Sequence, residues 1–268
     1  MNNLLKSAFA ATLLGLVAAT PAAAKLSADD IMRAVEDRDT GDHITQTMEM
    51  ILIDRKGNKR RRTLASYAQE RGEDTYSILF FITPADVKDS AFLTWDYDAY
   101  EKDDDHWLYL PALRKTKRIA SGDKSGSFMG SDFTYSDMSS RPLERYQYKL
   151  MKEVVINGQA AWQIESLPNP VEIARTGYKR SILFVRQDNF VVIRAVHWKQ
   201  KGGITKFLDV KKLELIDGIW VPIEIQMTSR KGKEVRHRTV LFTLNTQFDQ
   251  PMQEDWFTMG QLEKGRPL

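Results

Sequence analysis

The chain has no cysteine among its 268 residues. It therefore cannot form a disulfide, a thiolate metal site or the acylated cysteine that anchors a lipoprotein. Four histidines are present, but they are scattered and form neither an HExxH motif nor a His-x-His pair, so a zinc site is not indicated. The formal net charge is only +3, which argues against a dedicated nucleic-acid-binding domain, because such domains are usually far more basic.

The usual motifs of hydrolases and nucleotide-binding proteins are also missing, since there is no G-x-S-x-G elbow and no Walker loop. The acidic run Asp103-Asp104-Asp105-His106 could hold a metal ion, although neighbouring aspartates are more often solvated turn residues. Ser121 and Lys124 fit a Ser-x-x-Lys spacing, but Phe133 stands where that motif set needs an asparagine. We therefore expect no catalytic residue, no metal and no cofactor. An envelope hydrolase is the weakest alternative.

The N-terminal residues have the pattern of a secretory signal peptide. Lys6 supplies a positive charge, residues 8–19 are apolar, and Ala22, Ala23 and Ala24 offer a small-residue cleavage site. The apolar run is shorter than the ~20 residues that a membrane-spanning helix needs, and no later run reaches that length without charges. We expect a leader over residues 1–24 and one soluble, β-rich periplasmic domain over residues 25–268, without a lipid anchor.

A short helix is predicted over residues 27–38, because Ser27 is a hydroxyl N-cap three residues before Asp30 and an apolar face follows at helical spacing. Beyond it the hydrophobic period changes to two. The alternation predicts strands at residues 43–54, 60–70, 75–82, 91–97 and 106–110, and others through residue 228. The centre of residues 75–82 is apolar on both faces. A short closing helix is predicted over residues 254–259, docked by Trp256 and Phe257.

Many sequential antiparallel strands and few helices predict a mainly β fold, in which a single curved antiparallel sheet buries its apolar face. Such a sheet either closes into a barrel or stays half-wrapped around a cavity. Aromatic side chains are spread over most of the strands, and a cavity lined by them would suit acyl chains, since each buried methylene contributes about 0.8 kcal/mol. The alternative is that these aromatics fill the sheet's own core.

Residues 103–138 are the most distinctive part of the chain. They combine an aromatic strand at residues 107–111, a basic run at residues 114–118 and the sequence SGSFMGSDFTYSDM. This segment, with a weaker echo in residues 217–222, resembles the outer-membrane lipoprotein-sorting proteins of the LolA-like superfamily. The resemblance implies a LolA/LolB-like half-open barrel covered by a few short helices, with a hydrophobic cavity beneath them. It also implies a carrier of lipid rather than an enzyme.

Three groups of side chains are predicted to form the site. The ligand cavity is expected to be lined by aromatic side chains of the strands, namely Phe80, Trp95, Trp107, Tyr109, Tyr148 and Trp162. A deformable, glycine-bordered loop is expected to cover it through Phe128, Met129, Phe133 and Tyr135, unless these side chains simply staple an ordered loop to the sheet. Anionic headgroups or an acidic partner are expected to meet Arg114, Lys115, Lys117 and Arg118, unless these form a solvated edge that prevents aggregation.

The predicted function is that of a periplasmic carrier or chaperone, which buries a lipidated protein or another hydrophobic lipid for outer-membrane sorting or transport. The resemblance also implies association with an inner-membrane exporter of the RND/MMPL type. The alternative is therefore an accessory subunit of such an exporter without its own lipid cargo. We expect a monomer with no nucleic-acid partner.

Overall fold

The computed structural model describes residues 25–267, and the predicted signal peptide over residues 1–24 lies outside them. The described chain begins with helix α1 (Ala28–Glu36), and two more short α-helices follow later, α2 (Pro170–Thr176) and α3 (Met259–Lys264). The strands are β1 (His43–Asp54), β2 (Lys59–Arg71), β3 (Asp74–Thr83), β4 (Ala91–Asp96), β5 (Asp105–Leu110), β6 (Lys115–Ile119), β7 (Tyr146–Ile156), β8 (Gln159–Pro168), β9 (Tyr178–Arg186), β10 (Val192–Lys199), β11 (Ile204–Ile216), β12 (Ile219–Lys231) and β13 (Glu234–Phe248).

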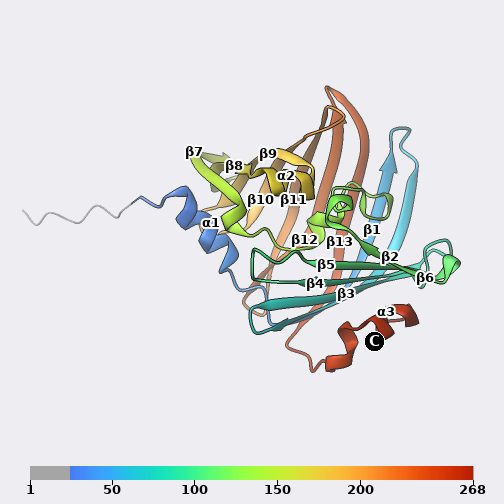
Figure 1. Cartoon of the computed structure of the whole chain (residues 1–268). Helices are drawn as coiled ribbons and strands as arrows, with labels where there is room; N and C mark the ends of the chain where they lie inside the picture. Colours follow the sequence, from blue (N-terminus) through green and yellow to red (C-terminus); the bar gives the residue numbers. More distant parts are fainter. Residues whose placement is uncertain (1–24, 268) are drawn as a thin grey trace, which may run out of the picture.

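All of these strands belong to one 13-stranded sheet, in the order β6-β5-β4-β3-β2-β1-β13-β12-β11-β10-β9-β8-β7. Neighbours in the sheet are antiparallel, and the pairing of β1 with β13, which sets Ile44 opposite Phe248, joins the two halves of the chain. The sheet is curved and stays open, because β6 and β7 lie at its two edges (Figure 1). The prediction of a mainly β, half-open barrel with short helices is confirmed. No helix in residues 25–267 has the length and apolar character that crossing a membrane requires.

Helix α1 covers one part of the concave face. Ser27 and Asp30 form the predicted capping box, in which the Ser27 hydroxyl accepts from the Asp30 amide at 3.1 Å and the Asp30 carboxylate accepts from the Ser27 amide at 3.0 Å. Ile31 and Met32 are buried in a cluster with side chains of β8, β9 and β10. The amphipathic face read from the sequence thus docks the helix onto the sheet.

Strand β3 packs on both of its faces, as its apolar centre predicted. Phe80 and Phe81 are both fully buried, but successive side chains of a strand point to opposite sides of the sheet. Phe81 packs inward with Phe128, whereas Phe80 packs outward with Phe257. The predicted closing helix is a 3₁₀ turn, η6 (Glu254–Phe257), followed by α3, and the Trp95 indole donates to the Phe257 carbonyl at 3.0 Å.

Residues 120–145, between β6 and β7, form an ordered segment that we call the insertion. It contains four 3₁₀ turns, η2 (Ser121–Asp123), η3 (Phe128–Gly130), η4 (Tyr135–Met138) and η5 (Leu143–Arg145). Phe128 is fully buried, with its ring centroid 5.1 Å from that of Phe92. The Arg62 guanidinium donates to the Met129 carbonyl at 2.6 Å, which ties η3 to β2. The insertion therefore packs against the concave face of the sheet.

Candidate functional site

A pocket of about 570 Å³ lies between α1, the insertion and the inner faces of β7 and β9 to β13. Its walls are mainly apolar, because the period-two pattern turns alternate side chains of these strands inward, such as Ile225 and Met227 on β12. Helix α1 adds Met32 and Val35 from one side. The remaining apolar lining residues are Phe133, Met138, Leu143, Tyr148, Leu183, Val192, Ala195, Leu208, Val210, Pro222 and Leu241.

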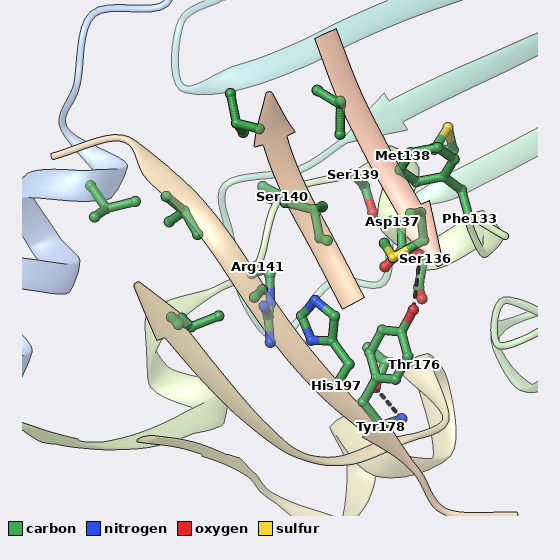
Figure 2. Close-up of a pocket in the computed structure, with 18 of the residues that line it drawn as sticks. Phe133, Ser136, Asp137, Met138, Ser139, Ser140, Arg141, Thr176, Tyr178 and His197 are labelled. Atoms are coloured by element: carbon green, nitrogen blue, oxygen red, sulfur yellow. Dashed lines mark hydrogen bonds between the residues drawn. The ribbon is translucent and has the colours of Figure 1, made fainter. Parts of the chain in front are cut away.

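The pocket has one polar end, where the insertion meets β9 and β10 (Figure 2). The Tyr178 hydroxyl donates to the Asp137 carboxylate at 2.9 Å, and the Tyr178 ring stacks on the His197 ring with centroids 4.7 Å apart. His197 Nδ1 lies 2.8 Å from the Ser181 hydroxyl. Burial, reinforced by the positive charge of Arg141, lowers the pKa of His197 to about 3. This histidine is therefore neutral near neutral pH.

Arg141 projects into the same end of the pocket, beside His197 (Figure 2). Its Nε lies 3.4 Å from the Tyr146 hydroxyl, and its guanidinium carbon lies 4.7 Å from the centroid of the Tyr146 ring. Within residues 25–267 no carboxylate comes within the 4.0 Å that defines an ion pair with this guanidinium. Arg141 thus adds a positive charge to a mainly apolar cavity.

A buried ionic network holds the insertion against α2. Asn169 caps α2 by accepting from the Glu172 amide at 2.9 Å, and the i,i+3 pair Glu172 and Arg175 bonds at 2.8 Å. Arg175 also reaches the Asp104 carboxylate, at 2.9 Å. Lys124, which is fully buried, lies 3.0 Å from the Asp103 carboxylate. The network thus joins the loop before β5, the insertion and the helix that precedes the pocket strand β9.

Ser139 and Ser140 form the rim of the pocket beside Arg141, and Asp96 holds this rim by hydrogen bonds. Its carboxylate accepts from the Ser140 amide at 2.6 Å and from the Ser140 hydroxyl at 2.9 Å, next to Arg141 in the chain. Burial, together with the neighbouring Asp104 carboxylate, raises the pKa of Asp96 to about 7. The Ser139 hydroxyl donates to Asp104 at 2.9 Å, so two consecutive serines of the rim bond to this carboxylate pair.

Proteins of known structure share the fold of this chain. A family model described as an uncharacterized protein matches residues 73–264. A DUF1329 family protein from Desulfovibrio piger is 28% identical, with a TM-score of 0.80 over 88% of this chain and 97% of its own. A domain from Vibrio parahaemolyticus assigned to outer membrane lipoprotein sorting is 29% identical, with a TM-score of 0.79 over 88% of this chain and 98% of its own. The chain belongs to the LolA-like superfamily.

A LolA superfamily protein from Nitrosomonas europaea shows the same fold at 17% identity, with a TM-score of 0.67 over 88% of this chain and all of its own, 100%. No curated protein matches the sequence. The LolA-like fold thus extends over nearly all of the described residues, and the pocket occupies the concave side of that fold.

Two of the residues predicted for the LolA-like site line this pocket, Tyr148 from the strands and Phe133 from the insertion. Four others are placed differently from the prediction. Phe80, Trp95, Trp107 and Tyr109 lie on the opposite face of the sheet, in the cluster covered by η6 and α3. The reason is the strand alternation, because their neighbours Phe81, Phe92 and Leu108 take the inner positions. Trp162 packs in the cluster of α1, with its ring stacked on Phe190 at 5.7 Å, and does not line the pocket.

The other predicted residues of the LolA-like site lie around the pocket rather than in it. Phe128, Met129 and Tyr135 pack between the insertion and the sheet, so the stapling alternative describes their contacts. The basic residues Arg114, Lys115, Lys117 and Arg118 are exposed at the edge strand β6 and the turn before it. Arg118 pairs with Asp105, and Lys117 lies 3.6 Å from Asp123. Their contact with a headgroup or partner stays a prediction.

The charged side chains of the Ser-x-x-Lys spacing and of the acidic run at residues 103–105 form ion pairs within the protein. Lys124 of the Ser-x-x-Lys spacing is engaged by Asp103, and Asp104 and Asp105 are engaged by Arg175 and Arg118. Within residues 25–267 no three histidine, aspartate or glutamate side chains gather as a metal site would require.

Arg141, His197 and Tyr178 were not singled out from the sequence, although they form the polar end of this LolA-like pocket. One signal was available, since His197 follows Ala195 at strand spacing and so shares its face. No comparable local signal marks Arg141, which lies in irregular chain before η5.

Proposed function

We propose that the protein is a carrier for a lipid or a lipidated protein in the bacterial periplasm, and that it holds acyl chains reversibly in the pocket between α1, the insertion and the sheet. The observation that carries this proposal is the apolar cavity of about 570 Å³ on the concave face. That size falls within the roughly 300–1,000 Å³ of typical ligand sites. Each methylene transferred from water into such a cavity contributes about 0.8 kcal/mol, and no covalent chemistry is needed.

Two further observations support the cellular setting. The N-terminal sequence has the pattern of a signal peptide over residues 1–24. The relative from Vibrio parahaemolyticus is assigned to outer membrane lipoprotein sorting. A protein exported to the periplasm would meet acyl chains from both membranes, and an open half-barrel can release its cargo without unfolding.

The direct test is lipid extraction and mass spectrometry of protein purified from its native envelope, where we expect a stoichiometric acyl lipid. Ala195→Phe should remove it, because Ala195 is buried in the pocket wall and a phenyl ring there fills the space that the chain needs. Val196→Phe is the matched control, since the next residue of β10 points to the other face. Thermal melts confirm that both variants are folded.

Equal lipid content in wild type and Ala195→Phe would contradict the proposal. An empty wild-type pocket, together with co-purification of an inner-membrane exporter, would favour the accessory-subunit alternative instead.

We propose in addition that the insertion covers the ligand, with Phe133 as its contact. Phe133 is buried, lines the pocket and packs in the cluster of the insertion. Phe133→Ser should weaken binding of a fluorescent acyl probe by roughly tenfold, since loss of about 1.4 kcal/mol of apolar contact corresponds to that factor. Phe242→Ser, on β13 but outside the pocket lining, serves as control. Unchanged affinity in Phe133→Ser would count against a covering role.

A further inference from the structure

Arg141 places a positive charge in the lining of the pocket, and a purely apolar ligand would offer this charge no partner. It belongs to the lining, yet its polar contact in the described chain is the Tyr146 hydroxyl at 3.4 Å, beside the face of the same ring. The Tyr146 hydroxyl also donates to the buried Glu172 carboxylate, and two other arginines have this carboxylate as their partner. Arg145 and Arg175 both pair with the buried Glu172 carboxylate, at 3.3 and 2.8 Å. Among residues 25–267 the fold thus supplies an ion-paired carboxylate to these two arginines and none to Arg141.

The acidic groups near Arg141 are already engaged or lie at the mouth. Asp137 accepts from the Tyr178 hydroxyl at 2.9 Å and from the Thr134 amide at 2.8 Å. Glu36, on α1, lines the pocket but is exposed. Neither carboxylate lies within ion-pair distance of the Arg141 guanidinium.

The other cations near this end of the pocket do not have a carboxylate partner within the described chain either. Lys206 is buried and donates to the Asp132 carbonyl, and Lys199 donates to the Ser125 carbonyl at 3.2 Å. His197 faces Arg141 as a neutral ring. Asp137 acts electrostatically on Arg141, Lys199 and Lys206, but one carboxylate does not balance three cations. The polar end therefore carries an excess of positive charge, which a low-dielectric environment makes costly unless an anion is supplied.

We propose that the ligand of this pocket is an amphiphile with an anionic head, a carboxylate or a phosphate, that pairs with Arg141, while its apolar tail lies among Leu183, Val192, Leu208 and Ile225. This inference rests on the proposed carrier function and specifies its cargo. A guanidinium presents a planar fork of donors that matches two oxygens of either head. The separation of one cationic end from apolar walls gives the pocket the polarity of a single amphiphile.

The test compares three ligands with the same chain, dodecanoate, dodecyl phosphate and dodecanol, as competitors of a neutral fluorescent probe at about pH 8, where carboxyl groups are ionised. In the wild type, at least one of the two anions should bind about tenfold or more tightly than the alcohol, as expected for a charge-assisted hydrogen bond in a dry site. Arg141→Met should abolish this preference, so that neither anion binds more tightly than dodecanol in the same variant. Arg141→Lys should keep part of it, and the exposed Arg60→Gln should keep all of it.

The wild-type comparison needs no variant, so it stands even if Arg141→Met folds poorly. A preference for dodecanoate indicates a fatty-acid head and a preference for dodecyl phosphate a phospholipid-type head, and either result supports the proposal. Equal affinity for all three ligands, or a preference that persists in a folded Arg141→Met variant, would overturn the head-group inference and leave the carrier function standing. Failure of every ligand and of the probe to bind would overturn both.

Discussion

Arg175→Met should lower the free energy of unfolding by about 3–5 kcal/mol, the cost expected when one partner of a buried ion pair is removed. Arg175 is 2% exposed and bonds to Asp104 at 2.9 Å and to Glu172 at 2.8 Å. Burial raises the pKa of Glu172, but the hydrogen bonds and charge of Arg175 outweigh it, and the pKa of this carboxyl lies below its ordinary value. Without Arg175, both carboxylates lose a charged partner in a dry environment.

Chemical denaturation of wild type and variant measures this effect. Arg236→Met is the matched control, because the side chains of Arg236 and its partner Glu234 are 44% and 50% exposed, and solvent screens such a pair. The control should change the unfolding transition little. If Arg175→Met behaved like Arg236→Met, the network would not be what fastens the insertion to α2.

The Arg175 substitution should also weaken lipid binding at temperatures where the variant is folded. Asp104 accepts from the Ser139 hydroxyl at 2.9 Å, and Ser139 lines the pocket. If Asp104 moves when its partner Arg175 is removed, its hydrogen bond to Ser139 is lost, and the pocket rim next to Arg141 is no longer held in place.

His106→Leu should make the protein less sensitive to acid. His106 is fully buried on β5, and neither of its ring nitrogens has a hydrogen-bond partner within residues 25–267. Burial, reinforced by the positive charges of Lys124 and Arg175, lowers the pKa of His106 to about 3 from an ordinary value of 6.5. Between these two pH values the unfolded chain binds a proton that the folded chain does not, so stability falls as the pH falls from about 6.5 towards 3.

The magnitude follows from the pKa difference. At about pH 4.5 the native state has lost roughly 2–3 kcal/mol through this one group, since each pH unit below the unfolded pKa corresponds to about 1.4 kcal/mol. The difference in free energy of unfolding between His106→Leu and the wild type should therefore be about 2–3 kcal/mol more favourable to the variant at pH 4.5 than at pH 8. Asp96 acts in the opposite direction, because its pKa is raised to about 7 by burial and its destabilising ionisation disappears on acidification. For this reason the pH dependence of the difference between variant and wild type is the informative quantity.

Urea unfolding at the two pH values checks this expectation. Thr94→Val is the control, because Thr94 pairs with His106 across β4 and β5, is 2% exposed and does not titrate. Its effect should be equal at both pH values. A His106→Leu effect that is also independent of pH would show that the buried imidazole is not depressed in pKa.

The curved antiparallel sheet was accessible from sequence because strand alternation and turn residues are local properties. For Tyr148, strand alternation also predicted a residue that lines the pocket. Its neighbours Gln147 and Lys149 are polar, so β7 has one apolar face, and that face turns inward. Ser27 and Asp30 likewise set the start of α1 through their own hydrogen bonds.

The inner face of β3, β4 and β5 could not be assigned in that way. Both sides of these strands are apolar, with Phe80 and Phe81 equally buried, so alternation alone does not distinguish them. The choice is made by what packs on each side, the insertion on one and the C-terminal residues on the other. For that reason Trp95, Trp107 and Tyr109 were placed in the cavity by sequence reasoning and lie outside it in the structure.

The sequence by itself determined the class of fold, the capped helix and the presence of enough apolar side chains for a cavity, because each rests on composition, periodicity or short-range hydrogen bonds. The superfamily was indicated by the resemblance of residues 103–138 to known family members. Only the tertiary structure decided which apolar side chains line that cavity and that Arg141, His197 and Tyr178 meet at one end of it. These three residues come from the insertion and two strands, and their approach depends on sheet curvature and on the buried network around Arg175. No local pattern carries that information.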